Sequence, residues 1–296
     1  MNNSGKNLNI EFNVSVIIPV YNAAGYVTKA VESALSQQET MEVVLVEDFS
    51  PDNSLEVCQE LARKYEKVKL FQHRDKRNHG AGASRNLGIK KASGEFISFL
   101  DADDYYLPGY FECSREILIN NPDIDGVYGA TGFHYYEESL YKKELFRKKG
   151  INVELTTIKE VISPNKLFEK MGPIGDKGHF HLDGLVIRKL IFNKCGYFNT
   201  GLKLCQDTHM CIKMAAVGKL VTGSIDKPIA MRGVHEENRS TANHERVSFY
   251  RTKLYLSLFI WGIKKRLPFR RLKKILKLHL RSVKEYKEYR LNNRVN

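Results

Sequence analysis

Asp101-Ala102-Asp103-Asp104 places three carboxylates within four residues, directly after the apolar run 96–100. Carboxylates this close together repel one another unless a cation lies between them. Hard divalent ions such as Mg²⁺ and Mn²⁺ bind carboxylate and phosphate oxygens together. The cluster therefore predicts a site for Mg²⁺ or Mn²⁺ beside a phosphate-bearing ligand. The alternative is a solvated acidic turn that caps the following helix.

The elements that must position this cluster alternate between strands and helices. β-Branched apolar runs predict buried parallel strands, and apolar residues at helical spacing predict helices between them. The strands are expected at 14–22, 41–46, 68–73 and 95–100, and the helices at 24–37, 55–65 and 83–92. This order predicts an α/β fold with a mostly parallel, Rossmann-like sheet and helices on both of its faces.

Open parallel sheets bind their ligands beyond the carboxyl ends of the strands. These ends carry Tyr21-Asn22 after the first strand, Glu47-Asp48 after the second and the aspartate cluster after the fourth. Separate strands therefore bring acidic groups to one rim, which predicts a single binding site there. Beyond residue 105 the patterns are weaker. We expect helices at 107–120, 156–169 and 207–217, and strands at 126–136, 184–191 and 219–224.

The excess positive charge lies at the C-terminal end of the sequence. Residues 246–296 hold 16 Lys/Arg against 2 Asp/Glu, a balance of +14, whereas the whole chain has a net charge of +13. Apolar spacing predicts two helices there, separated at Leu267-Pro268. The expected apolar face of the second helix is Leu272, Leu276, Val283 and Tyr286.

This basic amphipathic extension has three interpretations. It could rest on an anionic membrane surface, where basic side chains bind lipid headgroups. It could instead be a docking or dimerisation arm, which would make a homo-oligomer. It could also bind nucleic acid, but no recognised nucleic-acid motif accompanies it. Trp261 beside Lys264-Lys265-Arg266 is typical of an interfacial helix, so we favour the membrane surface.

Cysteines and apolar runs indicate the compartment. The five cysteines are scattered and never spaced as C-x-x-C, which predicts free thiols in a reducing cytoplasm. The longest apolar runs, such as 254–263, are shorter than the roughly 20 residues that cross a bilayer. Residues 1–12 are polar and contain no signal-peptide core. We therefore expect a cytoplasmic protein, with peripheral contact to the inner face of the membrane.

Four motifs in order resemble glycosyltransferase family 2, a family of inverting, nucleotide-sugar-dependent enzymes with a GT-A fold. They are VSVIIPVYN (14–22), VLVEDFSPDNS (44–54), GAGASRNLGI (80–89) and GEFISFLDADD (94–104). The resemblance implies a nucleotide-sugar-binding half at 13–110 and an acceptor-binding half at 111–245. The polar segment 1–12 precedes them, and the basic helical extension 246–296 follows.

By this resemblance, the first half of the chain binds the donor. Pro19 and Tyr21 would meet the nucleotide, and Asp48 would accept a hydrogen bond from a uracil ring. Within Asp101-Ala102-Asp103, Asp101 would lie near the ribose and Asp103 would hold the metal ion that bridges the two phosphates. Phe49 stands where the family pattern has glycine, so any left-handed backbone there would cost more.

Gly80-Ala81-Gly82-Ala83-Ser84-Arg85 follows the third strand and lacks the third glycine of a dinucleotide-binding fingerprint. In the family this loop packs beside the nucleotide. Arg85 would then contact the base or a phosphate. The alternative is a structural role, in which Arg85 pairs with one of the acids at the rim.

The resemblance also implies residues from the second half. Asp207 matches the general base, after a lead-in at 196–199, although Gln206 replaces the usual glutamate; the alternative for Asp207 is a helix N-cap. His235, in a segment of Arg-x-x-His type, would bind the metal or the pyrophosphate. Arg232 or Arg239 would neutralise phosphate charge. The polar segment with His179, His181 and Asp183 is a further candidate for the acceptor pocket.

The implied function is metal-dependent transfer of a sugar, with inversion, from a UDP-linked donor to a hydroxyl of a glycan or lipid-linked acceptor in surface polysaccharide synthesis. Addition of a single sugar is favoured over processive polymerisation. One alternative is a non-catalytic module that binds sugar nucleotides. Another is a sugar-nucleotide nucleotidyltransferase, which would carry a cation in a glycine-rich loop after the first strand. Residues 21–25 contain no such cation.

Overall fold

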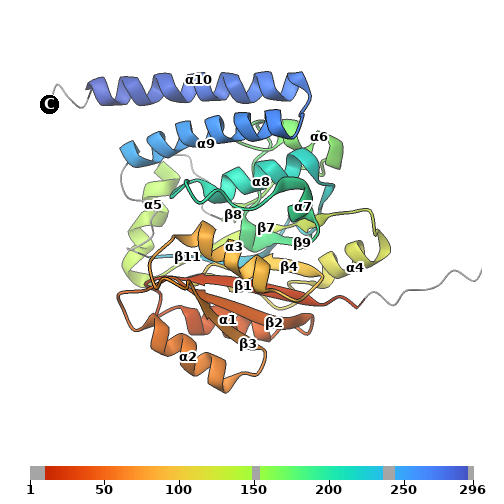
Figure 1. The fold of residues 1–296 in the computed structure, drawn as a ribbon, viewed down its shortest axis with the longest axis vertical. Helices are drawn as coiled ribbons and strands as arrows, with labels where there is room; N and C mark the ends of the chain where they lie inside the picture. Colours follow the sequence, from red (N-terminus) through yellow and green to blue (C-terminus); the bar gives the residue numbers. More distant parts are fainter. Residues whose placement is uncertain (1–10, 149–153, 236–243, 293–296) are drawn as a thin grey trace, which may run out of the picture.

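The computed structural model describes residues 11–148, 154–235 and 244–292, and its core is a seven-stranded sheet (Figure 1). The strand order is β10-β6-β9-β4-β1-β2-β3. The strands are β1 (Val14–Val20), β2 (Thr40–Glu47), β3 (Val68–Gln72), β4 (Phe96–Phe99), β6 (Gly126–Tyr128), β9 (Leu185–Arg188) and β10 (Leu220–Thr222). All neighbours pair in parallel except β9, which is antiparallel to both β4 and β6. The mostly parallel sheet predicted from the sequence is confirmed.

The direction in which consecutive strands are added reverses between β1 and β4. From β1 the chain adds β2 and β3 on one side, then returns to place β4 on the other. This reversal opens a crevice beyond the carboxyl ends of β1 and β4, which is where open α/β sheets bind ligands. Residue 21 and the aspartate cluster follow these two ends directly.

The two faces of this sheet are covered by different helices (Figure 1). Along β1, Val16 and Ile18 belong to one buried cluster and Ile17 to the other, because side chains of a strand alternate between faces. The first face packs on α1 (Val27–Leu35), α2 (Ser54–Lys64) and α4 (Glu112–Asn120). The second packs on α3 (Ala81–Lys91), α6 (Pro164–Lys170), α7 (Ile191–Cys195) and α8 (Gln206–Val217). Helices on both faces were predicted, and the structure has them.

A second sheet of four strands stands beside the rim, in the order β5-β11-β7-β8. Its strands are β5 (Tyr105–Tyr106), β7 (Ala130–Tyr135), β8 (Leu155–Thr156) and β11 (Pro228–Val234). The single strand predicted at 126–136 is wrong, because the chain passes from the first sheet to the second at Gly129. A Cβ at Gly129 would meet the carbonyl oxygen of Ser224 at 2.9 Å. The bend therefore needs a residue without a side chain.

The helix predicted at 156–169 is also mostly wrong. The segment begins in strand β8 and becomes helical only from Pro164, which occupies the first turn of α6, where a missing N–H costs nothing. The short helices α5 (Leu140–Lys148), η1 (Glu137–Ser139) and η2 (Leu182–Gly184) complete this half. Of the predicted segment 1–12, the structure describes Glu11 and Phe12, and the Phe12 ring packs on Phe96 with centroids 4.4 Å apart.

The basic extension forms α9 (His244–Lys264) and α10 (Phe269–Asn292), as predicted. Leu254 and Leu258 of α9 are buried in the same cluster as α8, and Trp261 Nε1 donates to the carbonyl of Cys195 at 3.0 Å. The apolar face predicted for α10 is partly wrong, because Leu276 is 37% exposed whereas its neighbour Ile275 is fully buried. No helix within the described ranges combines the length and apolar character needed to cross a membrane. All five cysteines are free thiols, as predicted.

Candidate functional site

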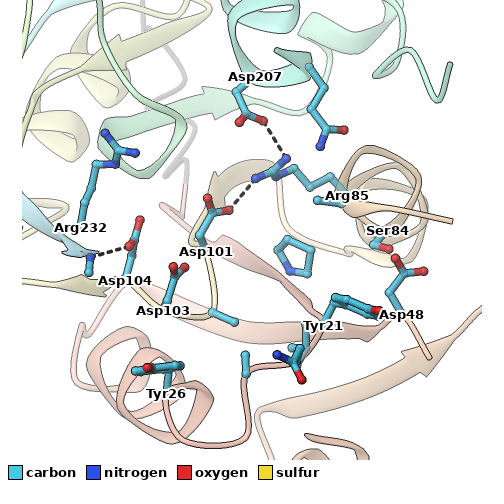
Figure 2. Close-up of a pocket in the computed structure, with 18 of the residues that line it drawn as sticks. Tyr21, Tyr26, Asp48, Ser84, Arg85, Asp101, Asp103, Asp104, Asp207 and Arg232 are labelled. Atoms are coloured by element: carbon cyan, nitrogen blue, oxygen red, sulfur yellow. Dashed lines mark hydrogen bonds and ion pairs between the residues drawn. The ribbon is translucent and has the colours of Figure 1, made fainter. Parts of the chain in front are cut away.

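A cavity of about 560 Å³ lies at the carboxyl ends of β1, β2 and β4, where the sheet meets α8, β11 and the first turns of α9 (Figure 2). This volume is in the usual range for a small-molecule ligand. All nine site residues predicted from the sequence line it: Pro19, Tyr21, Asp48, Arg85, Asp101, Ala102, Asp103, Asp207 and His235. Folding thus brings together side chains that are far apart in the chain.

Arg85, on α3, joins the two sides of this cavity. Its Nη2 contacts Oδ1 of Asp101 at 2.5 Å, and its Nη1 contacts Oδ1 of Asp207 at 2.7 Å (Figure 2). Burial by itself would lower the pKa of the guanidinium, but the two carboxylates raise it, so Arg85 stays protonated. Arg85 therefore pairs with acids at the rim, as the structural alternative predicted, and it pairs with two of them.

Two hydrogen bonds hold the aspartate cluster in place, one from its backbone to Asp183 and one from β11 to its Asp104 side chain. Asp183 Oδ1 accepts the backbone N–H of Asp101 at 3.0 Å, and Asp104 Oδ1 accepts that of Gly233 at 2.8 Å. A side chain at Gly233 would collide with the carbonyl oxygen of Asp103, so only glycine lets β11 approach this closely. The turn after β4 is therefore held from two directions.

The cluster is a crowded set of carboxylates, of which Asp104 and the neighbouring Asp183 are buried and Asp101 and Asp103 are partly exposed. Burial raises the pKa of Asp104 well above its usual range, and Asp183 and Asp103 raise it further. Burial also raises the pKa of Asp101 to about 6, although Arg85 opposes the shift. Burial would likewise raise the pKa of Asp183, but His181 and a hydrogen bond from Asp104 outweigh it and lower that pKa. A bound cation would relieve this repulsion.

The residues present fit a hard divalent cation. One carboxylate oxygen from each of Asp101, Asp103 and Asp104 lies within 4.8 Å of the others. His235 Nε2 lies 3.0 Å from Asp103 Oδ2, and two ligands of one octahedral Mg²⁺ or Mn²⁺ ion are about 3 Å apart. Tyr26 stacks on the His235 ring with centroids 4.6 Å apart, which fixes the ring beside the cluster. A set of carboxylate oxygens with one imidazole suits Mn²⁺ and Mg²⁺ better than softer metals.

Asp48 has a structural task in addition to lining the cavity. Its two carboxylate oxygens accept the backbone N–H groups of His79 at 2.8 Å and Gly80 at 2.7 Å. The carboxylate thereby anchors the loop that leads into α3 and Arg85. The next residue, Phe49, has a φ of 59° and a 54% exposed side chain. The left-handed backbone anticipated at the glycine position of the motif is therefore present.

Asp207 lies in the first turn of α8, but it does not cap the helix. The N-cap is Cys205, with a left-handed backbone of φ 60°, and no side chain accepts a capping hydrogen bond there. The Asp207 carboxylate, 33% exposed, instead turns toward the cavity and Arg85 (Figure 2). The N-cap alternative is therefore wrong. Arg232 also lines the cavity, whereas Arg239 lies outside the described residues.

The family model "Glycosyl transferase family 2" matches residues 15–172 of the chain. The chain belongs to glycosyltransferase family 2. An uncharacterised glycosyltransferase of Rickettsia felis is 33% identical over 238 residues, which cover 78% of this chain and 36% of the relative. A poly(ribitol-phosphate) β-glucosyltransferase of Bacillus spizizenii is 32% identical over 170 residues, covering 53% of this chain and 25% of that protein. The chain thus spans about a third or less of these relatives.

The structural comparison agrees on the fold of this family 2 member. A crystal structure of Staphylococcus aureus TarS, residues 1–349, in complex with UDP-GlcNAc superimposes with a TM-score of 0.65. The two sequences are 21% identical, and the match covers 91% of this chain and 72% of that one. The GT-A fold and the family predicted from the four motifs are therefore confirmed.

Several residues of this family 2 site were not among the predicted site residues. Tyr26 orients His235, and Gly233 admits β11 to the aspartate turn. Asp183 was predicted only as a candidate for the acceptor pocket, but it is fully buried and holds the backbone of Asp101. Its His181 partner lies 2.6 Å away. Gly233, two residues before His235, could have indicated a close backbone contact from the sequence alone. Nothing in the sequence pairs Tyr26 with His235, 209 positions later.

Proposed function

We propose that this chain transfers a sugar from a nucleotide-diphosphate sugar, UDP-linked, to a hydroxyl of a glycan or lipid-linked acceptor. The reaction is metal-dependent, inverts the anomeric carbon and contributes to surface polysaccharide synthesis. The observation that carries the proposal is the shared Arg85 guanidinium. It holds Asp101 of the aspartate motif and Asp207, the candidate base, in one 560 Å³ cavity.

The first half of the chain would bind the donor. Tyr21 and Asp48, at the ends of β1 and β2, would meet the nucleotide base, and Asp101 the ribose. Asp103 and His235 would hold Mg²⁺ or Mn²⁺, with Asp101 and Asp104 beside them. When bound, the ion stabilises the negative charge that develops on the departing nucleoside diphosphate.

The second half would supply the base and balance the charge. Asp207 would take the proton of the acceptor hydroxyl while its oxygen attacks the anomeric carbon and the bond from that carbon to the diphosphate oxygen breaks. Among the described residues, the contact of Asp207 with Arg85 is through Oδ1, which leaves Oδ2 to receive the proton. Such general-base catalysis typically contributes about 10²–10⁴-fold. Arg232, beside Asp104 and Gly233, would face the phosphates.

The substrates are inferred from two sources. The TarS domain that shares this fold was crystallised with UDP-GlcNAc, which supports a UDP-linked donor. The Bacillus relative carries the name of a poly(ribitol-phosphate) β-glucosyltransferase, which supports a surface polymer as the acceptor. Addition of a single sugar, homo-oligomer formation and peripheral contact with the membrane stay predictions. The surface that bears on the last of these is described below.

The deciding experiment is calorimetric titration of the purified chain with UDP, GDP and TDP, each with and without Mn²⁺. Asp103→Asn replaces one candidate carboxylate ligand with a neutral, weaker amide oxygen while keeping the shape of the side chain. Asp226→Asn, which removes an exposed carboxylate outside the cavity, is the matched control. We expect UDP to bind only with Mn²⁺, and this binding to be lost in Asp103→Asn and retained in Asp226→Asn.

Other outcomes separate the alternatives. If UDP binds but UDP-sugars are neither hydrolysed nor transferred, the chain is a non-catalytic module. If a nucleoside triphosphate and a sugar phosphate are condensed, it is a nucleotidyltransferase. If the folded protein binds no nucleotide at all, the donor site proposed here is wrong.

A further inference from the structure

Helix α10 is apolar on two sides, and one of them faces the protein. On that side Ile275 is fully buried, and Tyr286 packs on Phe249 of α9 with ring centroids 5.7 Å apart. Ser282 is buried too, and His279 Nδ1 lies 3.2 Å from the carbonyl of Thr252. This side accounts for the docking of α10 on α9. It leaves the second apolar side unexplained.

The second side is a narrow exposed strip. Phe269 is 79% exposed, Leu276 37%, Leu280 60% and Leu291 63%. At 3.6 residues per turn these four positions fall within about 60° of one another around the helix. They run from the first residue of α10 almost to its last. By the same spacing, Lys273 and Lys287 fall in this sector too, so the exposed side of the helix is a mixed apolar and basic surface.

Basic side chains lie within this strip and beside it. Lys273, Lys284 and Lys287 are exposed and interleave with its apolar residues, and Lys277 lies on its flank. The two acids of the helix are neutralised locally: Glu285 contacts Arg281 at 2.8 Å, and Glu288 lies 3.7 Å from Lys284. The surface therefore alternates apolar and positively charged side chains along the helix.

The position of α10 in the fold leaves this surface accessible. Figure 1 shows α10 as the outermost layer of the molecule, with α9 between it and α8. Within the described residues the strip has no cover, as the exposed fractions of its side chains show. The cavity lies at the strand ends, so contact through the outer face of α10 would leave the cavity open.

We propose that the outer face of α10 binds the surface of an anionic lipid membrane. Phe269, Leu276, Leu280 and Leu291 would enter the boundary between headgroups and acyl chains, and the lysines would contact lipid phosphates. A helix whose exposed side combines lysines with phenylalanine and leucines is the pattern of an interfacial helix. This inference goes beyond the proposed catalytic function and does not depend on it.

Charge decides between this partner and the other two that were considered. A second copy docked on the same strip would bring Lys273, Lys284 and Lys287 of the two copies together, and like charges in contact repel. A soluble polyanion would bind the lysines but would leave Phe269 and the leucines in water. Of these three partners, an anionic lipid surface is the one that matches both the charge and the apolar residues.

The test is co-sedimentation of the full chain with vesicles of phosphatidylcholine alone and of phosphatidylcholine mixed with phosphatidylglycerol. We expect binding to the mixed vesicles and not to the neutral ones. A basic residue near an anionic surface contributes about fivefold to partitioning. Replacing Lys273, Lys277, Lys284 and Lys287 with glutamine should therefore weaken binding about 100-fold or more at low salt. The matched control replaces four exposed lysines elsewhere: Lys90, Lys91, Lys159 and Lys227.

A second pair of variants isolates the apolar strip without changing charge. Phe269→Gln with Leu280→Gln should weaken vesicle binding about tenfold or more. Val161→Gln with Leu190→Gln, two exposed apolar residues far from α10 in the sequence, should leave it unchanged. Thermal unfolding of every variant checks that the fold is intact.

Three results would overturn the proposal. The first is absence of binding to the mixed vesicles. The second is binding that the control variants weaken as much as the α10 variants do. The third is a different partner: self-association lost in Phe269→Gln with Leu280→Gln would assign the strip to a second copy. Heparin binding that depends on the lysines and not on the strip, without vesicle binding, would assign the surface to a soluble polyanion.

Discussion

The two walls of the cavity are built differently. The first wall comes from residues 19–104. Most of its side chains lie at the carboxyl ends of β1, β2 and β4, three neighbouring parallel strands, and the others lie at the start of α1 and on α3. The second wall comes from residues 181–247, and its side chains reach the first through single polar contacts. Asp207 meets Arg85, Asp183 meets the N–H of Asp101, and His235 meets Asp103.

This difference separates two kinds of positioning. The first wall is placed by strand pairing and by buried side chains on both faces of the sheet, so one polar substitution there should leave its geometry intact. The elements of the second wall are held by apolar packing of α8 and by strand pairing of β11, but its polar side chains meet the first wall through charge-assisted contacts, each of which ends on a carboxylate. We therefore expect changes in the first wall to alter nucleotide binding, and changes in the second wall to alter turnover and metal binding.

The largest effect should come from the second wall. Asp207→Asn keeps the shape of the side chain but removes the basic oxygen, so we expect kcat to fall about 10²–10⁴-fold. The affinity for UDP with Mn²⁺ should change little, because the first wall binds the nucleotide. Turnover of UDP-sugar beside calorimetric affinity measures both. Turnover equal to that of the Asp226→Asn control would show that Asp207 is not the base.

The next largest effect should come from the residue that joins the walls. Arg85→Met leaves the Asp101 and Asp207 carboxylates without their cation, and because both carboxylates are partly exposed we expect a loss of about 1–3 kcal/mol of unfolding free energy. Turnover of the folded fraction should also fall, and Arg85→Lys should restore only part of it, because one ammonium cannot donate in two fixed directions.

A matched control for this variant is Arg188→Met. Arg188 is also buried and bonds Glu95 at 2.6 Å, but it lies outside the cavity. It should lose comparable stability with no change in the turnover of folded protein. Denaturant unfolding and single-turnover assays measure the two quantities separately. If both variants affect turnover alike, Arg85 acts only on stability.

A smaller effect is expected where the second wall meets the aspartate cluster. His235→Gln should weaken Mn²⁺ binding in the presence of UDP at least about tenfold, because a ligand or a close neighbour of the metal is lost. Excess Mn²⁺ should then restore turnover, which a purely structural role would not permit. His134→Gln, on β7 outside the cavity, is the control. Equal Mn²⁺ affinity in both variants would remove His235 from the metal site.

The smallest effect should come from the first wall. Phe49→Gly replaces a side chain at φ 59°, and we expect the unfolding free energy to rise by less than about 1 kcal/mol. Phe49→Ala keeps a Cβ, and therefore the strain, while it removes the same ring. Denaturant unfolding of the pair measures the strain alone. A glycine variant no more stable than the alanine variant would show that the left-handed backbone costs nothing here.

The accuracy of the sequence predictions follows the same division. The strands and helices of residues 14–100 lie within a few residues of their predicted positions, because short βαβ units carry their periodicity locally. The errors fall at 126–136 and 156–169. The first run is divided between two sheets at Gly129, and the second contains a two-residue strand whose partner is β7. Pairing with a distant strand leaves no periodic pattern in the sequence.

Sequence alone therefore determined the family, the parallel sheet, the aspartate cluster and nine of the residues that line the cavity, because strand ends and motif order are local properties. Only the tertiary structure decided what these residues contact. It assigned Arg85 to two carboxylates and placed Asp183 beneath Asp101. It also divided the apolar residues of α10 between a buried side and an exposed strip. The polar contacts depend on which groups, distant in the sequence, come together in the protein interior. Helical spacing identifies the apolar sides of a helix but cannot show which of them another element will cover.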